Sequence, residues 1–304
     1  MREKRSLEKK HQTSPLRRED FITGIICLSP SLLIVIIFVI FPILFSLGIS
    51  FFDWRIITQE KPFVGLANYV KMFTNPEFWN ALKNTALYTL GVVPVGAAIS
   101  LGLALLLNRN IRFSGFFRTA FFLPVITSTI AVAIVWLWIY NDHNGLLNII
   151  LRAVGMKPVT WLTSSKTALL SVIIMSIWKN AGYHMVIFLA GLQSIPESFY
   201  EAATLAGAGP FQKFRYITWP MLVPATLFVL VTNTIFSFQV FGPIYTMTGG
   251  GPVRSTTVIV YHLYVRAFEF QEMGYASAAA WVVFLLLIAM TFLQFRLSGK
   301  EKIL

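Results

Sequence analysis

Long apolar stretches without ionised side chains are the feature that most constrains this chain. Six of them occur, at residues 24–51, 84–107, 119–140, 167–192, 221–247 and 273–295. Five contain no Asp, Glu, Lys or Arg, and the fourth contains only Lys179. Because a helix rises about 1.5 Å per residue, each stretch can cross a hydrocarbon core of about 30 Å. The sequence therefore predicts an all-α membrane protein whose six transmembrane helices form one domain, residues 24–296.

Composition narrows the class further. Only 12% of the residues are charged, whereas about a quarter are charged in a soluble domain. The apolar stretches are too long for β-barrel strands and do not alternate with period two. The single cysteine, Cys27, excludes an internal disulfide and a cysteine metal cluster. The histidines also lack metal-ligand spacing, so the sequence predicts no metal site and no cofactor.

The distribution of Lys and Arg predicts an orientation. With the N-terminus inside, the inner segments carry 15 basic residues and the longer outer segments carry 9. By the positive-inside rule, both termini are then cytoplasmic. Residues 1–23 form a basic tail near anionic lipid head groups, and residues 297–304 form a short cytoplasmic C-terminus. The net charge of +12 is explained by this topology, and we expect no nucleic-acid partner.

A polar segment, residues 193–220, separates the fourth and fifth apolar stretches and would face the cytoplasm. Ser194 and Glu197 have the spacing of a helix capping box. Helix-forming residues continue to Ala206, and the glycine-rich turn "GAGP" then ends the helix. A second short helix, residues 211–217, is expected to end before Pro220. The alternative to a motion-transmitting helix–turn–helix is an ordered loop without that role.

The residues of this segment resemble the EAA motif of ABC-importer permeases. That motif has E-A-A, then G after three residues, then I-x-L-P after nine more. The matching residues are Glu201, Ala202, Ala203, Gly207, Ile217 and Pro220. The motif's Leu is replaced by Trp219, and an Asp often found before the Gly is replaced by Ala206.

The resemblance extends along most of the chain. "FVGLANYVKMF" (63–73), "IWKNAGYHMVIFLAGLQSIPESFYEAA" (177–203), "MTGGGP" (247–252) and "GYASAAAWVVFLLL" (274–287) are similar to maltose- and glycerol-phosphate-type permeases. Within that family the chain resembles the larger, maltose-permease-F-like partner of a heterodimeric pair. The likeness implies a bacterial cytoplasmic-membrane protein that imports a sugar or sugar derivative by alternating access.

The same resemblance implies the partners. They are a second homologous permease subunit, a cytoplasmic ATP-binding subunit dimer and an extracytoplasmic solute-binding protein. The EAA residues would dock on the ATPase, and ATP binding would move the docked helices together. The chain has no G-x-x-x-x-G-K-[ST] phosphate loop. We therefore expect a permease without catalytic residues, which leaves ATP hydrolysis to its partner.

Polar residues inside the fourth and fifth apolar stretches mark a candidate pathway. Ser176, Lys179, Asn180 and Tyr183 recur at helical spacing and share one face. In the fifth stretch, Asn233 and Ser237 share one face, while Phe236 and Gln239 lie on the adjoining face. Amides and hydroxyls suit the hydroxyl groups of a sugar, and aromatic rings suit its apolar faces.

Two alternatives apply to these residues. Each could instead form interhelical hydrogen bonds, worth on average about 0.6 kcal/mol. Lys179 could serve structure or gating rather than sugar selection. By position, the residues that match the substrate-contacting region of the maltose-type permease are Asn180, Tyr183, Asn233, Phe236 and Ser237.

Two other functional classes remain to be weighed. An ion-coupled secondary transporter usually has intramembrane acids as coupling groups, and the six stretches contain none. An intramembrane enzyme needs a nucleophile–base pair or metal ligands at membrane depth. His184, which we expect to be packed or hydrogen-bonded, is insufficient for that.

Overall fold

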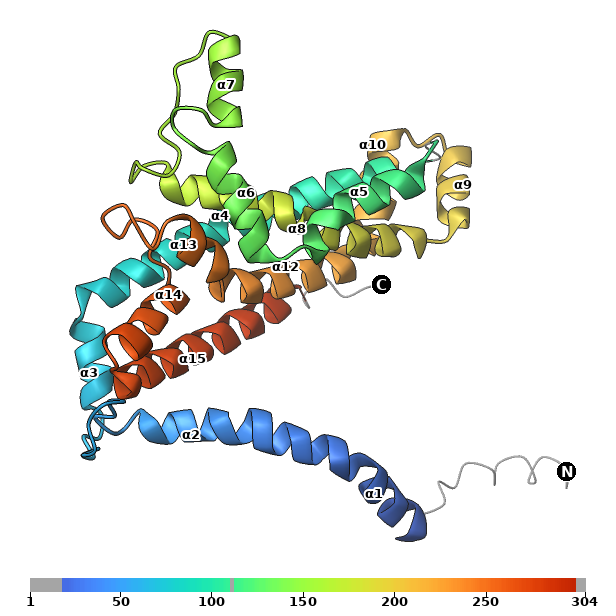
Figure 1. The fold of residues 1–304 in the computed structure, drawn as a ribbon. Helices are drawn as coiled ribbons and strands as arrows, with labels where there is room; N and C mark the ends of the chain where they lie inside the picture. Colours follow the sequence, from blue (N-terminus) through green and yellow to red (C-terminus); the bar gives the residue numbers. More distant parts are fainter. Residues whose placement is uncertain (1–17, 110–111, 299–304) are drawn as a thin grey trace, which may run out of the picture.

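The computed structural model describes residues 18–109 and 112–298, and its regular secondary structure there is helical apart from two isolated β-bridges. The terminal segments 1–23 and 297–304, predicted to be cytoplasmic, lie largely outside the described residues. Four long helices form the body: α4 (Pro76–Leu107), α8 (Ala168–Gln193), α12 (Val223–Phe238) and α15 (Met273–Ser298). They run alongside one another in Figure 1. Shorter helices join them: α3 (Ala67–Thr74), α7 (Leu146–Ala153) and α14 (Ile259–Tyr264), the last followed by the π-helical turn η4 (Val265–Glu269).

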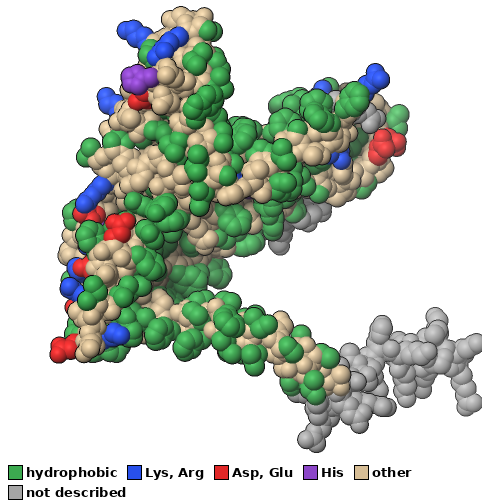
Figure 2. Space-filling view, in the orientation of Figure 1, with side chains coloured by type: hydrophobic (Ala, Val, Ile, Leu, Met, Phe, Trp, Pro, Cys, Tyr) green, Lys and Arg blue, Asp and Glu red, His purple; other side chains and the backbone are tan. Residues whose placement is uncertain are grey.

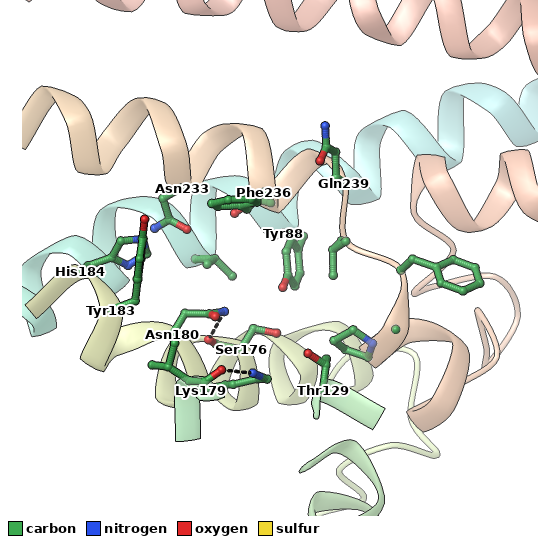
Figure 3. A pocket seen from close by; sticks show the side chains of 17 residues that line it. Tyr88, Thr129, Ser176, Lys179, Asn180, Tyr183, His184, Asn233, Phe236 and Gln239 are labelled. Carbon is green, nitrogen blue, oxygen red and sulfur yellow. Dashed lines mark hydrogen bonds between the residues drawn. The ribbon is translucent and has the colours of Figure 1, made fainter. Parts of the chain in front are cut away.

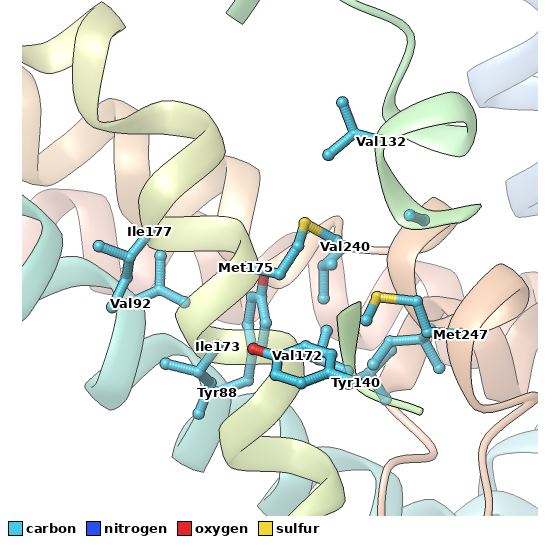
Figure 4. Packing of buried hydrophobic residues seen from close by; sticks show 13 residues of the cluster. Tyr88, Val92, Val132, Tyr140, Val172, Ile173, Met175, Ile177, Val240 and Met247 are labelled. Carbon is cyan, nitrogen blue, oxygen red and sulfur yellow. The ribbon is translucent and has the colours of Figure 1, made fainter. Parts of the chain in front are cut away.

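The most extensive packing joins α4 and α8. Figure 4 shows Val92 of α4 beside Ile173 and Ile177 of α8, in a buried apolar cluster that also contains Tyr140. The Tyr140 hydroxyl donates to the Ser171 carbonyl at 2.8 Å. Helices predicted as separate spans therefore share one well-packed centre.

The first predicted span forms an arm that stands apart from this body (Figure 1). It consists of α1 (Arg18–Val35), the π-helical turn η2 (Ile36–Ile40) and α2 (Phe41–Ile49). The most apolar part of the arm has no buried residue, and Figure 2 shows hydrophobic side chains over it. Its end is anchored, because Asn68 of α3 donates to the carbonyls of Ser50 at 2.8 Å and Phe52 at 2.9 Å.

The third predicted span is not a single helix. It divides into α5 (Ser114–Ile126) and α6 (Thr129–Ile139), which are bent by 99°. Pro124 lies in the last turn of α5, just before the bend. Within the described residues, four uninterrupted helices are long and apolar enough to cross a membrane, and six spans result only if each bent pair counts as one.

The fifth predicted span, 221–247, is also interrupted. Its helix α12 ends at Phe238, and a separate helix, α13 (Gly242–Met247), follows. Pro243 lies in the first turn of α13, where a proline is well tolerated because the first-turn N–H groups have no partner within the helix. The prediction of one continuous helix here is wrong.

Two further predictions in segment 193–220 are wrong in detail. Helix α9 (Glu197–Leu205) follows Pro196 and has no side-chain cap, because the Ser194 hydroxyl donates to the Gly191 carbonyl instead. The second short helix continues through Pro220 as α10 (Pro210–Lys213), the π-helical turn η3 (Phe214–Thr218) and α11 (Trp219–Met221). In a regular α-helix the proline ring would clash with the carbonyl four residues earlier, and the wider π-turn before Pro220 relieves that clash. The bend comes later, and measures 62° between Pro210–Met221 and α12.

Candidate functional site

A cavity of about 510 Å³ lies between α8 and α12, with one wall from α4. It is lined by all eight residues that the sequence places in a pathway: Ser176, Lys179, Asn180, Tyr183, Asn233, Phe236, Ser237 and Gln239. Figure 3 shows the α8 residues facing those of α12 across the space. The structure thus brings the two predicted faces together, and their contact with a substrate stays a prediction.

The α8 side of the cavity is mostly polar. Ser176 is buried, and the Asn180 amide donates to the Ser176 carbonyl at 2.9 Å. Tyr183 keeps 36% of its surface exposed. Lys179 is also buried, and its ammonium donates to the carbonyls of Pro124 and Val125, each at 3.3 Å. This lysine is therefore held by the end of α5.

The α12 side combines buried polar groups with an exposed aromatic ring. Asn233 and Ser237 are buried, whereas Phe236 is 61% exposed. Gly96 of α4 faces Asn233, since a Cβ placed on Gly96 would lie 3.7 Å from the Asn233 amide nitrogen. The absence of a side chain at Gly96 leaves room around this amide.

Four buried polar atoms of the cavity have no hydrogen-bond partner in the described part of the chain. They are Ser176 Oγ, His184 Nε2, Asn233 Nδ2 and Ser237 Oγ. More than nine in ten buried polar groups in folded proteins are paired, and an unpaired one costs about 1–3 kcal/mol. Four such atoms around one space indicate a site where a polar ligand or water completes the bonding.

The sequence did not identify every residue that lines the cavity. His184 packs against the Tyr183 ring with 5.4 Å between ring centroids, as expected for a packed histidine, but it also lines the cavity. Tyr88, Thr129 and Phe241 line it as well. Tyr88 is an aromatic residue in an apolar stretch, which by sequence indicates core packing as readily as a site.

Both helix breaks border the cavity. Val125 and Thr129 contribute from the α5–α6 break, and residues 241–243 contribute from the α12–α13 break. The helices α6 and α13 that follow the breaks pack against each other, and a Cβ on Gly242 would lie 3.5 Å from Thr129 Cγ2. Interrupted helices that surround a polar space are typical of membrane transport sites.

The EAA-type residues form a separate hairpin at the other end of α8. Glu201 and Ala202 are exposed on α9, and Gly207 adopts a φ of +79° in the turn. The Tyr200 hydroxyl lies 2.9 Å from the Thr218 hydroxyl, which ties the two arms of the hairpin together. Ile217 packs against the adjoining core cluster, while Pro220 is exposed.

The tip of this hairpin exposes large apolar side chains. Leu205 is 92% exposed, Phe211 78% and Tyr216 74%. The Lys213 ammonium donates to the Thr204 hydroxyl at 2.8 Å and braces the turn behind them. The result is a fixed apolar surface at the end of a polar segment.

An ion-pair cluster lies outside the cavity and ties together the ends of several helices. It comprises Lys71, Glu77, Arg254, Arg266 and Glu272. Arg266 reaches Glu77 at 2.9 Å and Glu272 at 3.2 Å, and Lys71 reaches Glu272 at 2.7 Å. Burial acts to raise the pKa of Glu272, but hydrogen bonds and charge attraction from Lys71 and Arg266 outweigh it and lower that pKa. Figure 2 shows these charges gathered near α3 and η4.

A comparison with known families decides the identity. The model of the family described as "binding-protein-dependent transport system inner membrane component" matches residues 95–302. The chain belongs to this family. Its members are permeases of ABC transporters, so this chain is a multi-pass inner-membrane permease.

Individual relatives of this chain are also named as permeases. A probable ABC transporter permease of Bacillus subtilis, YurN, is 39% identical and aligns over 89% of this chain and 94% of its own length. The lactose transport system permease protein LacF of Rhizobium radiobacter is 35% identical over 95% of this chain and 98% of its own length. A trehalose/maltose transport system permease, MalF of Thermococcus litoralis, is 34% identical over 94% and 97%.

A solved structure shares the fold of this ABC permease. A bacterial ABC transporter involved in alginate import matches with a TM-score of 0.80 over 93% of this chain and 97% of its own. Its sequence is 24% identical. The overall fold described above is therefore one that a solved ABC transporter structure also contains.

Proposed function

We propose that the cavity carries a sugar or sugar derivative and that the hairpin of residues 193–220 couples this transport to a separate cytoplasmic ATPase. In this proposal both termini and the hairpin are cytoplasmic. ATP binding draws the docked hairpins together, and the cavity then changes the side of the membrane to which it opens. An external solute-binding protein delivers the sugar.

The observation that carries the proposal is a set of polar atoms, unpartnered among the described residues, that lie beside aromatic rings in one cavity. Hydroxyls of Ser176 and Ser237 and the amide of Asn233 can exchange hydrogen bonds with sugar hydroxyls. The exposed ring of Phe236 offers a flat apolar surface to a sugar face. A volume of about 510 Å³ lies within the range of small-molecule sites. Asn180, Tyr183 and Gln239 complete the proposed contacts.

The relatives favour a carbohydrate. Two of them are named for lactose and for trehalose and maltose, and each aligns with at least 94% of this chain. No carboxylate lines the cavity within the described residues, and the lining Lys179 donates to backbone carbonyls. The proposed site therefore suits a polyhydroxylated ligand without a positive charge.

The proposed docking surface for the ATPase is the exposed tip of the hairpin. On α9 and the turn that follows it, the proposed coupling residues are Glu201, Ala202, Ala203 and Gly207. The other two, Ile217 and Pro220, lie on the segment that leads back into α12. Leu205 and Phe211 give the tip an apolar area of the kind that protein partners bury.

A second permease subunit is the proposed partner of the arm formed by α1, η2 and α2. From Ile25 to Phe45 the arm exposes many large apolar side chains, yet it contacts the helices of the body mainly through α2 and α15. Another permease subunit and membrane lipid together would cover it.

ATP hydrolysis by the assembled transporter tests the proposal. The chain would be co-expressed with the products of neighbouring genes, reconstituted in lipid, and assayed with lactose, trehalose and maltose, each with and without the binding protein. We expect stimulation only when the binding protein and a sugar are both present. An ATPase that fails to co-purify, with uptake that follows an ion gradient, would refute the proposal.

A glycine pair tests the coupling hairpin separately. Gly207→Val forces a β-branched residue into a φ of +79°, which costs about 1–2 kcal/mol and reshapes the turn. No neighbouring atom lies near the added Cβ, so the effect comes from the backbone alone. Gly155→Val is the matched control, since Gly155 has a φ of +78° and equally open surroundings in another loop. We expect only Gly207→Val to lose ATPase co-purification and uptake, and equal losses in both variants would contradict the coupling role.

A further inference from the structure

Lys179 is the one charged residue in the six apolar stretches, and the structure gives it specific partners. Its ammonium donates to the carbonyls of Pro124 and Val125, both at 3.3 Å. These carbonyls belong to the last turn of α5, where the helix breaks and its own hydrogen bonds stop. The Thr127 hydroxyl also donates to Pro124 at 2.7 Å. The end of α5 is therefore capped by side chains, one of them from a different helix.

Gly182 holds α5 against α8 close to the same point. A Cβ placed on Gly182 would overlap the Phe121 carbonyl oxygen and lie 2.7 Å from the carbonyl carbon. It would also lie 3.0 Å from Phe122 Cα. Only glycine allows this backbone contact, and Lys179 precedes it by one turn of α8. The two residues thus fasten α5 to α8 by contact and by hydrogen bonding.

The charge of Lys179 suits this position. A helix C-terminus carries a partial negative charge, and a cation beside its unpaired carbonyls is favourable. The side chain is almost fully buried, with 6% exposed, and no carboxylate lines the cavity within the described residues. The helix end, rather than an acidic side chain, supplies the compensation that a buried cation needs.

We propose that Lys179 is a positioning residue that fixes the break between α5 and α6, and with it the cavity wall that contains Val125 and Thr129. By this inference Lys179 does not select the transported molecule by charge. The α6 helix, which packs against α13 at the second break, keeps its direction because α5 is held at its end. The inference rests on contacts within the chain and is independent of the sugar proposal.

The distance between α5 and α6 tests this inference directly. Phe116 on α5 and Trp138 on α6 are 70% and 62% exposed and do not line the cavity, so Phe116→Cys and Trp138→Cys can carry spin labels. Cys27→Ser removes the competing thiol. The distance between the two labels would then be measured by pulsed electron–electron double resonance. The sample would be the full-length chain, purified with the co-expressed products of neighbouring genes and placed in lipid nanodiscs.

We expect Lys179→Met to broaden the label-to-label distance distribution by at least about twofold, since a bend keeps its angle only through identifiable contacts. Lys179→Arg should restore the narrow distribution, because its guanidinium can donate to both carbonyls. Lys83→Met is the matched control, because Lys83 is exposed on α4, and it should leave the distribution unchanged. If Lys179→Met does not reach the membrane, Lys179→Gln should show the same broadening, since its shorter side chain does not span both carbonyls.

A distribution in Lys179→Met that matches the parent chain would overturn the proposal and return Lys179 to the groups that face the transported molecule. Equal broadening in Lys179→Arg would overturn it too, because cationic donation would then not be what holds the break.

Discussion

The ion-pair cluster and the cavity both contain buried or half-buried polar side chains, but they differ in how those groups are paired. In the cluster both carboxylates have two basic partners each, and the members come from α3, α4, η4, the loop before α14 and the residue before α15. In the cavity, one side-chain atom each of Ser176, His184, Asn233 and Ser237 has no hydrogen-bond partner among the residues that the structure describes. Paired groups hold segments of one chain together, whereas unpaired groups lower stability unless something else binds them.

The difference separates polar groups that stabilise the fold from polar groups that are available to bind a ligand. Both carboxylates of the cluster are paired within the chain, although Arg266 Nε has no partner among the described residues. Removing the cluster should therefore cost stability and leave transport by folded molecules unchanged. The cavity should behave in the opposite way. Lys179 lies at the cavity but is paired with carbonyls, and it belongs by this criterion with the structural groups.

Removing Glu77 should give the largest effect and tests the structural half of the comparison. Glu77→Ala takes a partner from both Arg254 and Arg266 and leaves Arg266, whose side chain is 16% exposed, with one carboxylate. We expect a loss of stability of about 1–3 kcal/mol, measured as thermal unfolding in detergent. Uptake per folded molecule should stay normal.

Glu269→Ala is the control, since Glu269 is exposed and has no ion pair among the described residues. Lost uptake at unchanged stability would place the cluster in the transport machinery.

Replacing Asn233 tests the functional half. Asn233→Leu removes a buried amide whose nitrogen has no partner and substitutes an apolar side chain of similar size. We expect uptake to fall by about tenfold, equivalent to about 1.4 kcal/mol, with thermal stability unchanged or raised. Thr232→Val is the neighbouring control, because Thr232 donates to the Phe228 carbonyl of its own helix and does not line the cavity. If Asn233→Leu destabilises the chain as much as Glu77→Ala while uptake stays normal, the comparison fails.

Most of the helices could be predicted from the sequence, and the breaks could not. Apolar length alone identifies spans, because the backbone hydrogen bonds of a lipid-facing segment must be satisfied within it. Prolines did not identify the breaks. Pro30 and Pro94 lie inside continuous helices, whereas Pro124 lies at a bend of 99°. What distinguishes this end of α5 is its tertiary contacts: the Pro124 carbonyl accepts from Lys179, and the Phe121 backbone packs against Gly182, in each case more than 50 residues away in the sequence.

The candidate cavity was partly predictable for a similar reason. Helical periodicity groups Ser176, Asn180 and Tyr183 on one face, so their common location follows from α8 alone. Tyr88 comes from α4 and faces the cavity only because α4 and α8 pack closely. His184 is adjacent to Tyr183 in sequence, and only the three-dimensional arrangement shows that its Nε2 has no partner within the described part of the chain.

Ser237 offers a smaller test of the cavity. Ser237→Ala removes one unpaired hydroxyl with little change in volume. We expect a fall in uptake of about threefold, consistent with the roughly 0.5–1.5 kcal/mol of a typical hydrogen bond, and no loss of thermal stability. Combining it with Asn233→Leu should give less than the product of the two effects if both groups contact one ligand. A fully multiplicative result would place the two residues at independent sites.

Replacing Lys71 should give the smallest effect on stability, and that effect should depend on pH. The Lys71 side chain is 50% exposed, so Lys71→Ala should lower stability by only about 0.2–1 kcal/mol. The folded-state pKa of Glu272 is lowered from 4.5, so the ion pair contributes fully above that pH and is lost as the pH falls through the folded value. Thermal unfolding of the parent chain and of Lys71→Ala should therefore differ at pH 7 and converge in more acidic buffer. A difference that persists after Glu272 is protonated would mean that Lys71 stabilises the chain through another contact, for instance with the Tyr275 ring, whose centroid lies 5.6 Å from its ammonium, and not through its ion pair with Glu272.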